Sequence, residues 1–287
     1  MFPSEFEYLR AENLEQALNW LQENDGAMVL AGGHSLIPIL KMRLAEPSVL
    51  IDIRRISELA GISDEGDRIR IGALTTHSQI AASSLLRENC AVLAEAAARI
   101  ADPQVRNMGT IGGNLAHADP GSDLPAVAVA LEAEIELSSN GRKRAVSSRE
   151  FFIDLMTTEI QPGEILTSIR FDRFESPTGS CYLKLEHPAS GYAVCGVAAI
   201  VRLDAAGNCS RLRLALNGVT AVPFAADAVS RALEGSSLRD DDIEEALSNH
   251  LEISDPMGDA FASGEYRLHL ARVYARQALR QARDRAR

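Results

Sequence analysis

The stretch AGGHSLIPILKMR (residues 31–43) constrains the fold more than any other part of the chain. It continues the apolar run 27–31 through paired glycines, a pattern that predicts a short buried strand, a glycine turn and a helix over 36–44. Pro38 is compatible with that helix because amides of a first turn lack helical partners anyway. Since glycine has no Cβ, the turn can adopt positive φ and bring its amides close to an anion.

A second pair of glycines lies in GTIGGN (residues 109–114), after an apolar helix predicted over 91–100. We interpret this segment as another glycine turn, so that each turn could hold part of a pyrophosphate. Either pair alone is more typical of a tight connection between two elements. Neither pair matches G-x-G-x-x-G, which disfavours a nicotinamide-dinucleotide site.

Periodicity predicts the remaining helices and strands. An amphipathic helix is expected over 13–24, with Asn13 as its N-cap and Gln16 at the reciprocal capping position. Further helices are predicted over 79–86, 226–233, 241–251 and 266–283, and strands over 49–53, 68–71, 131–138, 165–171, 182–185, 194–203 and 212–219. The composition changes at the turn-prone residues 175–177, which indicates a domain boundary there.

Length and charge disfavour several classes of protein. A chain of 287 residues favours two or three packed subdomains. The formal net charge of −11 argues against nucleic-acid binding, and the arginines of the last helix are interpreted as a solvated face. No apolar run reaches the ~18 residues that a membrane helix needs. No secretory signal is visible, so a cytoplasmic protein is expected.

The four cysteines, Cys90, Cys181, Cys195 and Cys209, lie far apart and form no C-x-x-C pair. This spacing disfavours zinc or an iron–sulfur cluster within the chain, and no other metal ligand set is visible. The cysteines are therefore predicted to be small core residues.

The two glycine segments have a specific context in the rest of the sequence. The second belongs to IADPQVRNMGTIGGN (100–114), and ADPGSDLPA (118–126), YLKLEHPASGYAVCGVAA (182–199) and EYRLHLARVYARQAL (265–279) follow it. Together with the first segment, these motifs resemble the FAD-binding medium subunit of aerobic carbon monoxide dehydrogenase and its relatives in the xanthine dehydrogenase group. The resemblance spans essentially the whole chain.

The resemblance implies an α+β fold with two FAD-binding subdomains, at 1–57 and 58–174. Together these would form a two-part module of the PCMH (vanillyl-alcohol oxidase-like) type. A smaller C-terminal α+β domain, a three-stranded sheet with helices, is expected over 175–287. No catalytic residue is expected in this chain.

The resemblance also implies which residues bind FAD. The pyrophosphate is expected between the amides of Gly32, Gly33, His34 and Ser35 and those of Thr110, Ile111, Gly112 and Gly113. The other implied FAD-binding residues are Ala31, Leu36, Ile100, Asn114, Asp123, Leu166, Lys184 and Tyr192. Lys184 is expected near the reduced flavin ring and Tyr192 beside the isoalloxazine.

Three of these residues have ordinary structural interpretations as well. Asp123 could be the N-cap of a helix beginning at Leu124, since aspartate is a favoured capping residue. Lys184 could be a surface lysine, and Tyr192 could be a core aromatic. For His34, the backbone is expected to matter more than the imidazole.

The function implied by the resemblance is electron transfer within a molybdenum hydroxylase. FAD in this chain would take electrons from [2Fe-2S] clusters in a small partner subunit and pass them to an external acceptor. A large partner subunit would carry the molybdenum-pterin cofactor, and the complex would be a dimer of heterotrimers. Carbon monoxide is not a safe substrate assignment, because EHPASGY (186–192) lacks the basic stretch often found at this point in carbon monoxide dehydrogenases.

Two alternatives stay open. One is a self-sufficient flavoenzyme of related fold, such as UDP-N-acetylenolpyruvoylglucosamine reductase, which would turn over an organic substrate without partners. The other is a nucleotide-binding scaffold that uses both glycine segments without redox chemistry and would bind an adenine nucleotide as well as FAD.

Overall fold

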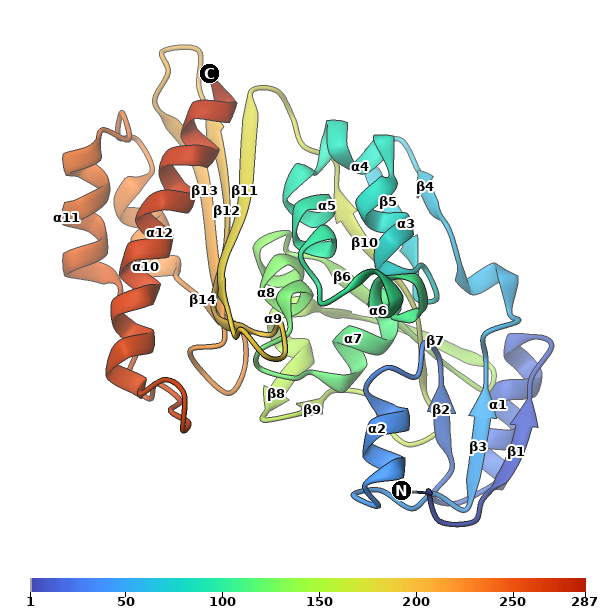
Figure 1. Ribbon diagram of the computed structural model, residues 1–287. Coiled ribbons are helices and arrows are strands. Elements are labelled where there is room, and N and C mark those ends of the chain that lie inside the picture. Colours follow the sequence, from blue (N-terminus) through green and yellow to red (C-terminus); the bar gives the residue numbers. More distant parts are fainter. Residues whose placement is uncertain (1) are drawn as a thin grey trace.

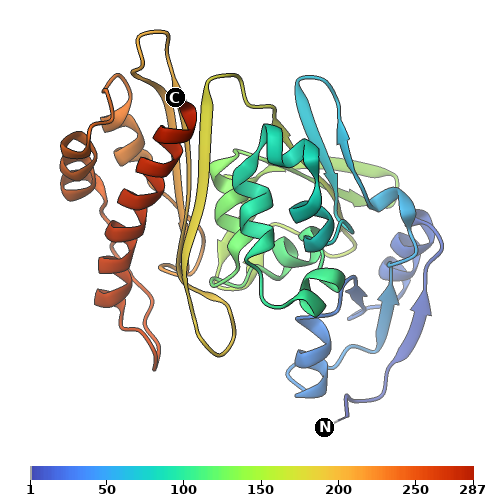
Figure 2. The same ribbon diagram turned by 45° about the horizontal axis from the view of Figure 1, so that its top comes forward.

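The computed structural model describes residues 2–287, which form three parts side by side in chain order (Figures 1 and 2). The first part contains a parallel sheet of order β1–β3–β2, made of Glu7–Arg10, Val49–Asp52 and Met28–Leu30. Helices α1 (Leu14–Glu23) and α2 (Leu36–Lys41) belong to the same part. Strand β2 leads directly into the first glycine segment, which α2 follows.

The predicted first helix is confirmed, including its N-cap. The Asn13 side chain accepts a hydrogen bond of 2.9 Å from the amide of Gln16. The Gln16 side chain reaches back one residue further than expected and accepts from the amide of Glu12 at 2.8 Å. Strand β1 was not expected from the sequence, because its four residues are mostly exposed and show no alternation.

The central part is built on an antiparallel sheet of order β4–β5–β10–β6–β7. Its strands are Ile62–Asp64, Arg68–Gly72, Ile165–Asp172, Glu134–Ser139 and Arg142–Ser147. Strand β10 lies between β5 and β6, so that Ile169 is opposite Ile71 on one side and Ile135 on the other. All three isoleucines are buried and join the largest hydrophobic core.

The long connection between β5 and β6 carries six helices. They are α3 (His77–Ala82), α4 (Ser84–Asn89), α5 (Ala91–Ala98), α6 (Pro103–Met108), α7 (Ile111–His117) and α8 (Asp123–Ala130). Every residue of α8 is buried, because this helix packs against α5 and α7 as well as strands of the C-terminal sheet. A helix enclosed on all sides needs no polar face, which explains its uniformly apolar sequence after Asp123.

Two predictions for the central part are wrong in detail. The helix expected over 79–86 is two short helices, α3 and α4, because Ser83 is extended and its side chain caps α4 through the amide of Leu86. The strand expected over 131–138 begins only at Glu134. Glu132 has a positive φ of 51°, so the chain turns there between α8 and β6.

After β7 the chain forms the short helix α9 (Ser148–Phe151) and a hairpin of β8 (Phe152–Asp154) and β9 (Thr157–Thr158). The 3₁₀ turn η1 (Ser57–Leu59) connects the first part to the central part. Its Leu59 is buried in the first core together with Leu74 and Ile165, so the two parts share apolar packing.

The third part is an antiparallel sheet of order β11–β12–β13–β14, which is one strand more than expected. The strands are Thr178–Glu186, Ala193–Leu203, Cys209–Asn217 and Phe224–Ala225, and the helices are α10 (Asp227–Leu233), α11 (Asp240–His250) and α12 (Gly264–Ala286). Helix α12 lies along β11 and β12 (Figure 2). Gly179 permits this contact, since a Cβ there would be 2.0 Å from the carbonyl oxygen of Ala282.

The cysteine prediction is confirmed, because all four thiols are unpaired and buried. Burial raises the pKa of each of them to about 12, which keeps them protonated and unreactive. Within residues 2–287, none of the helices combines the length and the apolar character needed to cross a bilayer.

Candidate functional site

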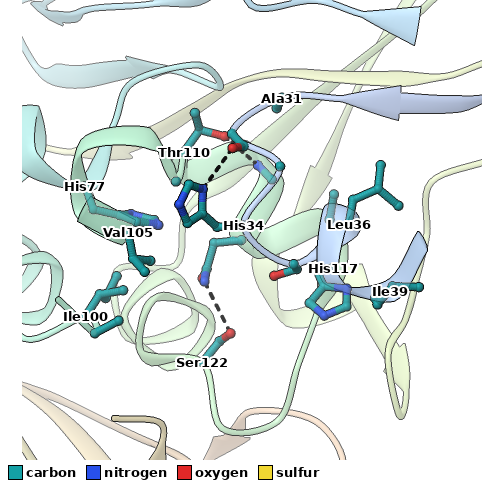
Figure 3. Close-up of a pocket in the computed structure, with 18 of the residues that line it drawn as sticks. Ala31, His34, Leu36, Ile39, His77, Ile100, Val105, Thr110, His117 and Ser122 are labelled. Carbon is teal, nitrogen blue, oxygen red and sulfur yellow. Dashed lines mark hydrogen bonds between the residues drawn. The ribbon is translucent and has the colours of Figure 1, made fainter. Parts of the chain in front are cut away.

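A cavity of about 390 Å³ lies where the three parts meet. Its volume is in the range of small-molecule and cofactor sites, which is about 300–1,000 Å³. Twelve of the sixteen residues predicted from the sequence line it: Ala31, Gly32, Gly33, His34, Ser35, Leu36, Ile100, Thr110, Gly113, Asn114, Asp123 and Tyr192. Figure 3 shows His34, Thr110 and Ser122 around this space, each from a different segment.

The first glycine segment presents unused hydrogen-bond donors to this cavity. Gly33 has a φ of +76°, and its carbonyl accepts from Ile37 as α2 begins. No atom of residues 2–287 accepts a hydrogen bond from the amides of residues 32–35. His34 contributes its imidazole locally, with Nδ1 3.0 Å from the Gly32 carbonyl oxygen. Consecutive free amides at one concave bend are suited to bind an anion.

The second glycine segment has a different structure from the one predicted. Thr110 is the N-cap of α7. Gly112 and Gly113 are helical residues at the start of α7, whereas the sequence predicted a glycine-rich loop. The amides of Ile111 and Gly112 donate to the carbonyls of Thr75 and Ala73, at 3.1 and 2.9 Å. The amide of Gly113 donates to the Thr110 hydroxyl at 3.2 Å.

These bonds correct the expectation that four amides of the second segment hold a pyrophosphate. Three of the four already have acceptors within the protein, which leaves the amide of Thr110. Ile111 and Gly112 are buried behind the cavity and are not part of its lining. Gly112 is needed for packing, because a Cβ there would be 2.5 Å from the Cβ of Ala73.

The two segments touch each other through their backbones. A Cβ on Gly32 would lie 2.3 Å from the Met108 carbonyl oxygen and 2.8 Å from the Cα of Gly109. The second segment is in turn held by α3, since the amide of His77 donates to the Gly109 carbonyl at 3.0 Å. Gly32 therefore allows the first part and the central part to close against one another at the cavity.

Two buried polar atoms beside the cavity have no partner among residues 2–287. They are Nδ1 of His77 and Oδ1 of Asn114. The amide nitrogen of Asn114 donates to the Ser122 hydroxyl at 3.2 Å (Figure 3). Burial, together with the smaller effects of the His34 and Arg106 charges, lowers the pKa of His77 to about 4, so this imidazole is neutral near pH 7. Buried polar groups are normally hydrogen-bonded, so these two atoms are exceptions within the wall of the cavity.

Asp123 begins α8 at the floor of the cavity and is almost fully buried. Its carboxylate accepts from the Tyr182 hydroxyl at 2.5 Å and from the Lys184 ammonium at 3.1 Å. Burial raises the pKa of Asp123 to about 6, against the opposing effects of Lys184 and Tyr182. The N-cap of α8 is Ser122, so the alternative interpretation of Asp123 as that cap is wrong.

Lys184 and Leu166 lie outside the cavity lining, in contrast to the expected flavin contacts. The Lys184 side chain has no exposed surface and points to Asp123. The interpretation of Lys184 as a surface lysine is wrong as well. Leu166 is buried in β10 as part of the central core. Lys184 therefore supports the cavity wall from behind, whereas Leu166 belongs to the central core.

Tyr192 lines the cavity and is 40% exposed, so it is not a core aromatic. Its ring lies over Gly121, where a Cβ would be 3.1 Å from Cδ1 of the tyrosine. Partial burial raises the pKa of Tyr192, with a contribution from the Asp119 charge. The loop 187–192, between β11 and β12, is held at its end by the amide of Ala193, which donates to the Gly121 carbonyl at 2.9 Å.

Sequence reasoning missed several residues of the lining, among them His77, Val105, His117, Ser122 and Ser190. His117 and Ser122 lie within a few residues of the predicted Asn114 and Asp123, and helical spacing from Asn114 could have identified His117. His77 has no comparable signal, because it reaches the cavity only through the pairing of Thr76 with Thr110.

Comparisons with known proteins cover both halves of the chain. Residues 4–172 match the family model described as the FAD binding domain in molybdopterin dehydrogenase, and residues 180–282 match that of the CO dehydrogenase flavoprotein C-terminal domain. The chain is 38% identical to the carbon monoxide dehydrogenase medium chain of Afipia carboxidovorans, over 100% of this chain and 99% of that protein.

Two other similarities extend over equally long stretches. The chain is 36% identical to the alpha subunit of the 6-hydroxypseudooxynicotine dehydrogenase complex of Paenarthrobacter nicotinovorans, covering 100% of this chain and 97% of the relative. The structure matches carbon monoxide dehydrogenase from Hydrogenophaga pseudoflava with a TM-score of 0.95 and 37% identity, covering 99% of both chains.

Proposed function

Since this chain belongs to the family of FAD-binding medium subunits of molybdenum-containing dehydrogenases and hydroxylases, we propose that it transfers electrons between its partner subunits and an external acceptor. The electrons would arrive from [2Fe-2S] clusters of a small subunit. A large subunit with a molybdenum-pterin cofactor would oxidise the substrate. We also propose a dimer of such heterotrimers as the complete complex.

One observation carries the FAD assignment within the structure. Residues 32–35, whose amides have no acceptor among residues 2–287, line a cavity together with Asn114 and His77, each of which has one buried side-chain atom without a partner. A ligand that satisfies them needs an anionic portion and further hydrogen-bonding groups. FAD fits this donor set, because its diphosphate is anionic and its ribose, ribityl and ring portions carry donors and acceptors.

We propose specific roles for the residues around the cofactor. The amides of residues 32–35 and of Thr110 would hold the diphosphate. Asn114 and Asp123 would bind polar groups further along the cofactor, and Tyr192 would cover the isoalloxazine. When bound, FAD supplies chemistry that can accept electrons one at a time and release two together. The protein residues orient the cofactor and control which molecules reach it.

We further propose that the chain is organised as units 1–57, 58–174 and 175–287. Each range contains one of the three main sheets. The two family matches meet between residues 172 and 180, where β10 ends and β11 begins. The cavity takes residues from all three ranges, so we expect FAD to bind only when all three are folded together.

The experiment that tests the proposal begins with the purified full chain. We expect it to carry FAD or to bind added FAD stoichiometrically, with quenching of flavin fluorescence. With its small and large subunits added, the chain should allow substrate to reduce an artificial acceptor. A folded chain that binds no FAD, or a complex whose electron flow is unchanged without this subunit, would contradict the proposed function.

The same preparation separates the two alternatives. Turnover of an organic substrate by the isolated chain would favour a self-sufficient flavoenzyme. Competition by ADP at concentrations similar to those of FAD would favour a nucleotide-binding scaffold. The proposed function predicts neither result, and it predicts that FAD binds much more tightly than ADP because the cavity extends to Tyr192.

A further inference from the structure

A buried polar cluster lies directly behind the cavity and joins α8 to the C-terminal sheet. Its members are Asp123 at the start of α8, Tyr182 and Lys184 on β11, and Asn217 at the end of β13. All four are at most 4% exposed. The Tyr182 hydroxyl donates to Asp123 and lies 3.2 Å from Oδ1 of Asn217. Gly196 leaves room for this contact, because a Cβ there would be 2.3 Å from both oxygens.

The ammonium of Lys184 connects two different walls of the cavity. It donates to Oδ2 of Asp123 at 3.1 Å and to the carbonyl oxygen of Gly191 at 2.7 Å. Asp123, Gly191 and Tyr192 all line the cavity, whereas Lys184 does not. A buried ammonium without acceptors would be strongly unfavourable, so these two bonds fix the positions of the groups that accept them.

We propose that Lys184 is a positioning residue, which holds the Asp123 carboxylate and the Gly191–Tyr192 backbone in the orientation that receives FAD, without touching the cofactor itself. This inference rests on the proposed function, because it assigns FAD to the cavity. It differs from a direct interaction between the ammonium and the flavin. A direct contact would make the effect of Lys184 independent of Asp123.

Removal of the Lys184 charge should change the ionisation of Asp123. Burial raises the pKa of Asp123, and Lys184 is the strongest influence that lowers it again. The other titratable groups that act on Asp123 are Tyr182 on β11, Arg99 after α5 and Tyr192 in the loop. Without Lys184 the pKa of Asp123 therefore rises further, and the group becomes protonated near pH 7. Raising the pH should restore its charge.

The main test is a double-mutant cycle on the full chain with Lys184→Met, Asp123→Asn and both together, measured by FAD titration. At pH 7 we expect Lys184→Met to weaken FAD binding at least tenfold, and the double variant to bind about as weakly as the weaker single variant. The difference in FAD affinity between wild type and Lys184→Met should become smaller as the pH is raised to 9. Effects that multiply in the double variant, or a gap that stays constant with pH, would overturn the inference in favour of direct contact.

A second readout does not depend on FAD. Hydrogen exchange at residues 187–192 should be faster in Lys184→Met than in wild type, because the bond to the Gly191 carbonyl is lost, and unchanged in Asp123→Asn. Unchanged exchange in Lys184→Met would show that Lys184 does not hold the backbone of residues 187–192 in place. If Lys184→Met does not fold, Lys184→Gln replaces it, since an amide can still donate to one of the two acceptors. Lys143→Met on the exposed face of β7 is the matched control and should behave as wild type.

The two proposals fail in different ways. If the wild-type chain binds no FAD, the proposed function is wrong and the role of Lys184 toward FAD falls with it. If the wild-type chain binds FAD and the cycle shows independent effects, only the inference about Lys184 is wrong.

Discussion

The two glycine segments look alike in sequence and use their glycines differently. In AGGHS, the glycines form an open bend whose amides have no acceptor among the described residues. In GTIGGN, they lie in the first turn of α7, where the amides of Ile111, Gly112 and Gly113 already donate within the protein. The first segment has donors that remain available for the proposed ligand, and the second allows close packing of α7 on Ala73.

The difference shows that a pair of glycines in a sequence predicts only that two Cβ atoms are missing and that space is free there. Whether the free space receives a ligand or a neighbouring chain depends on what the fold places beside it. At Gly32 the neighbour is the second segment itself, so this glycine allows close packing and also lines the cavity. Substitutions at these glycines should therefore separate effects on FAD binding from effects on stability.

Gly32→Ala should have the largest effect. The added Cβ would meet backbone atoms of Met108 and Gly109, which cannot rotate away, so the two segments must separate. We expect FAD binding to weaken by about 100-fold, which corresponds to about 2.8 kcal/mol. Flavin-fluorescence titration measures this loss. Binding within threefold of wild type would show that the two segments need not be in contact.

Gly112→Ala should mainly lower stability. Its Cβ would be 2.5 Å from the Cβ of Ala73 and 2.8 Å from the carbonyl oxygen of that residue, which pushes α7 away from its support. Overpacking of this kind typically costs about 1–3 kcal/mol. Urea unfolding of the chain without FAD gives the value. A variant that loses FAD affinity but no stability would mean that Gly112 belongs to the ligand site after all.

His77, which lies beside the contact between the two segments, should make the free energy of unfolding depend on pH. Its folded pKa of about 4 lies below the ordinary value of 6.5, so the unfolded chain binds more protons in this range. The stabilisation is present above pH 6.5 and is lost as the pH falls toward 4. From the size of this shift we expect a loss of about 2 kcal/mol between pH 7 and pH 5.

The comparison that isolates this effect is His77→Gln, because Asp123 titrates over an overlapping range with the opposite sign. Its raised pKa means that stability from this group falls as the pH rises between about 4 and 6. The unfolding free energy of wild type should therefore decrease more steeply than that of His77→Gln from pH 7 to pH 5. Equal slopes would show that His77 is not buried in the neutral form.

Gly113→Ala should have the smallest effect. Its Cβ would be 3.0 Å from the Thr110 hydroxyl, a side-chain atom, and 3.8 Å from the Cβ of Ala31. Alanine is also the better helix former by about 1 kcal/mol. We expect the unfolding free energy to change by less than about 1 kcal/mol, and FAD affinity to fall less than in Gly32→Ala. A larger loss of affinity would show that the cofactor fills the space beside the Gly113 Cα.

Most of the elements could be predicted from the sequence because their patterns are local. Helix α1 and the buried cysteines are examples, since amphipathic spacing and composition are enough to identify them. Strand β1 and the break at Ser83 depend on pairing partners and on a side-chain cap, which a short exposed or uniformly helical pattern does not reveal.

The candidate site shows the same division. The residues of AGGHSL could be assigned to the cavity because the bend exposes consecutive amides, and all six line it. The burial of Lys184 and Leu166 outside the lining could not be predicted, because it depends on the contact of β11 with Asp123 and on the packing of β10 in the central core. His77 lies far from both motifs in sequence and is brought to the cavity by a single backbone bridge.

The cavity is assembled from residues as far apart as Met28 and Tyr192, which gives its formation an order in time. A chain leaves the ribosome from its N-terminus, so the first glycine segment emerges long before the Tyr192 loop. Cofactor loading must therefore wait until β11 and the following loop have been translated. A nascent chain stopped before Gly191 would display the amide bend with one wall missing, so flavin retention by stalled chains should rise only after this point.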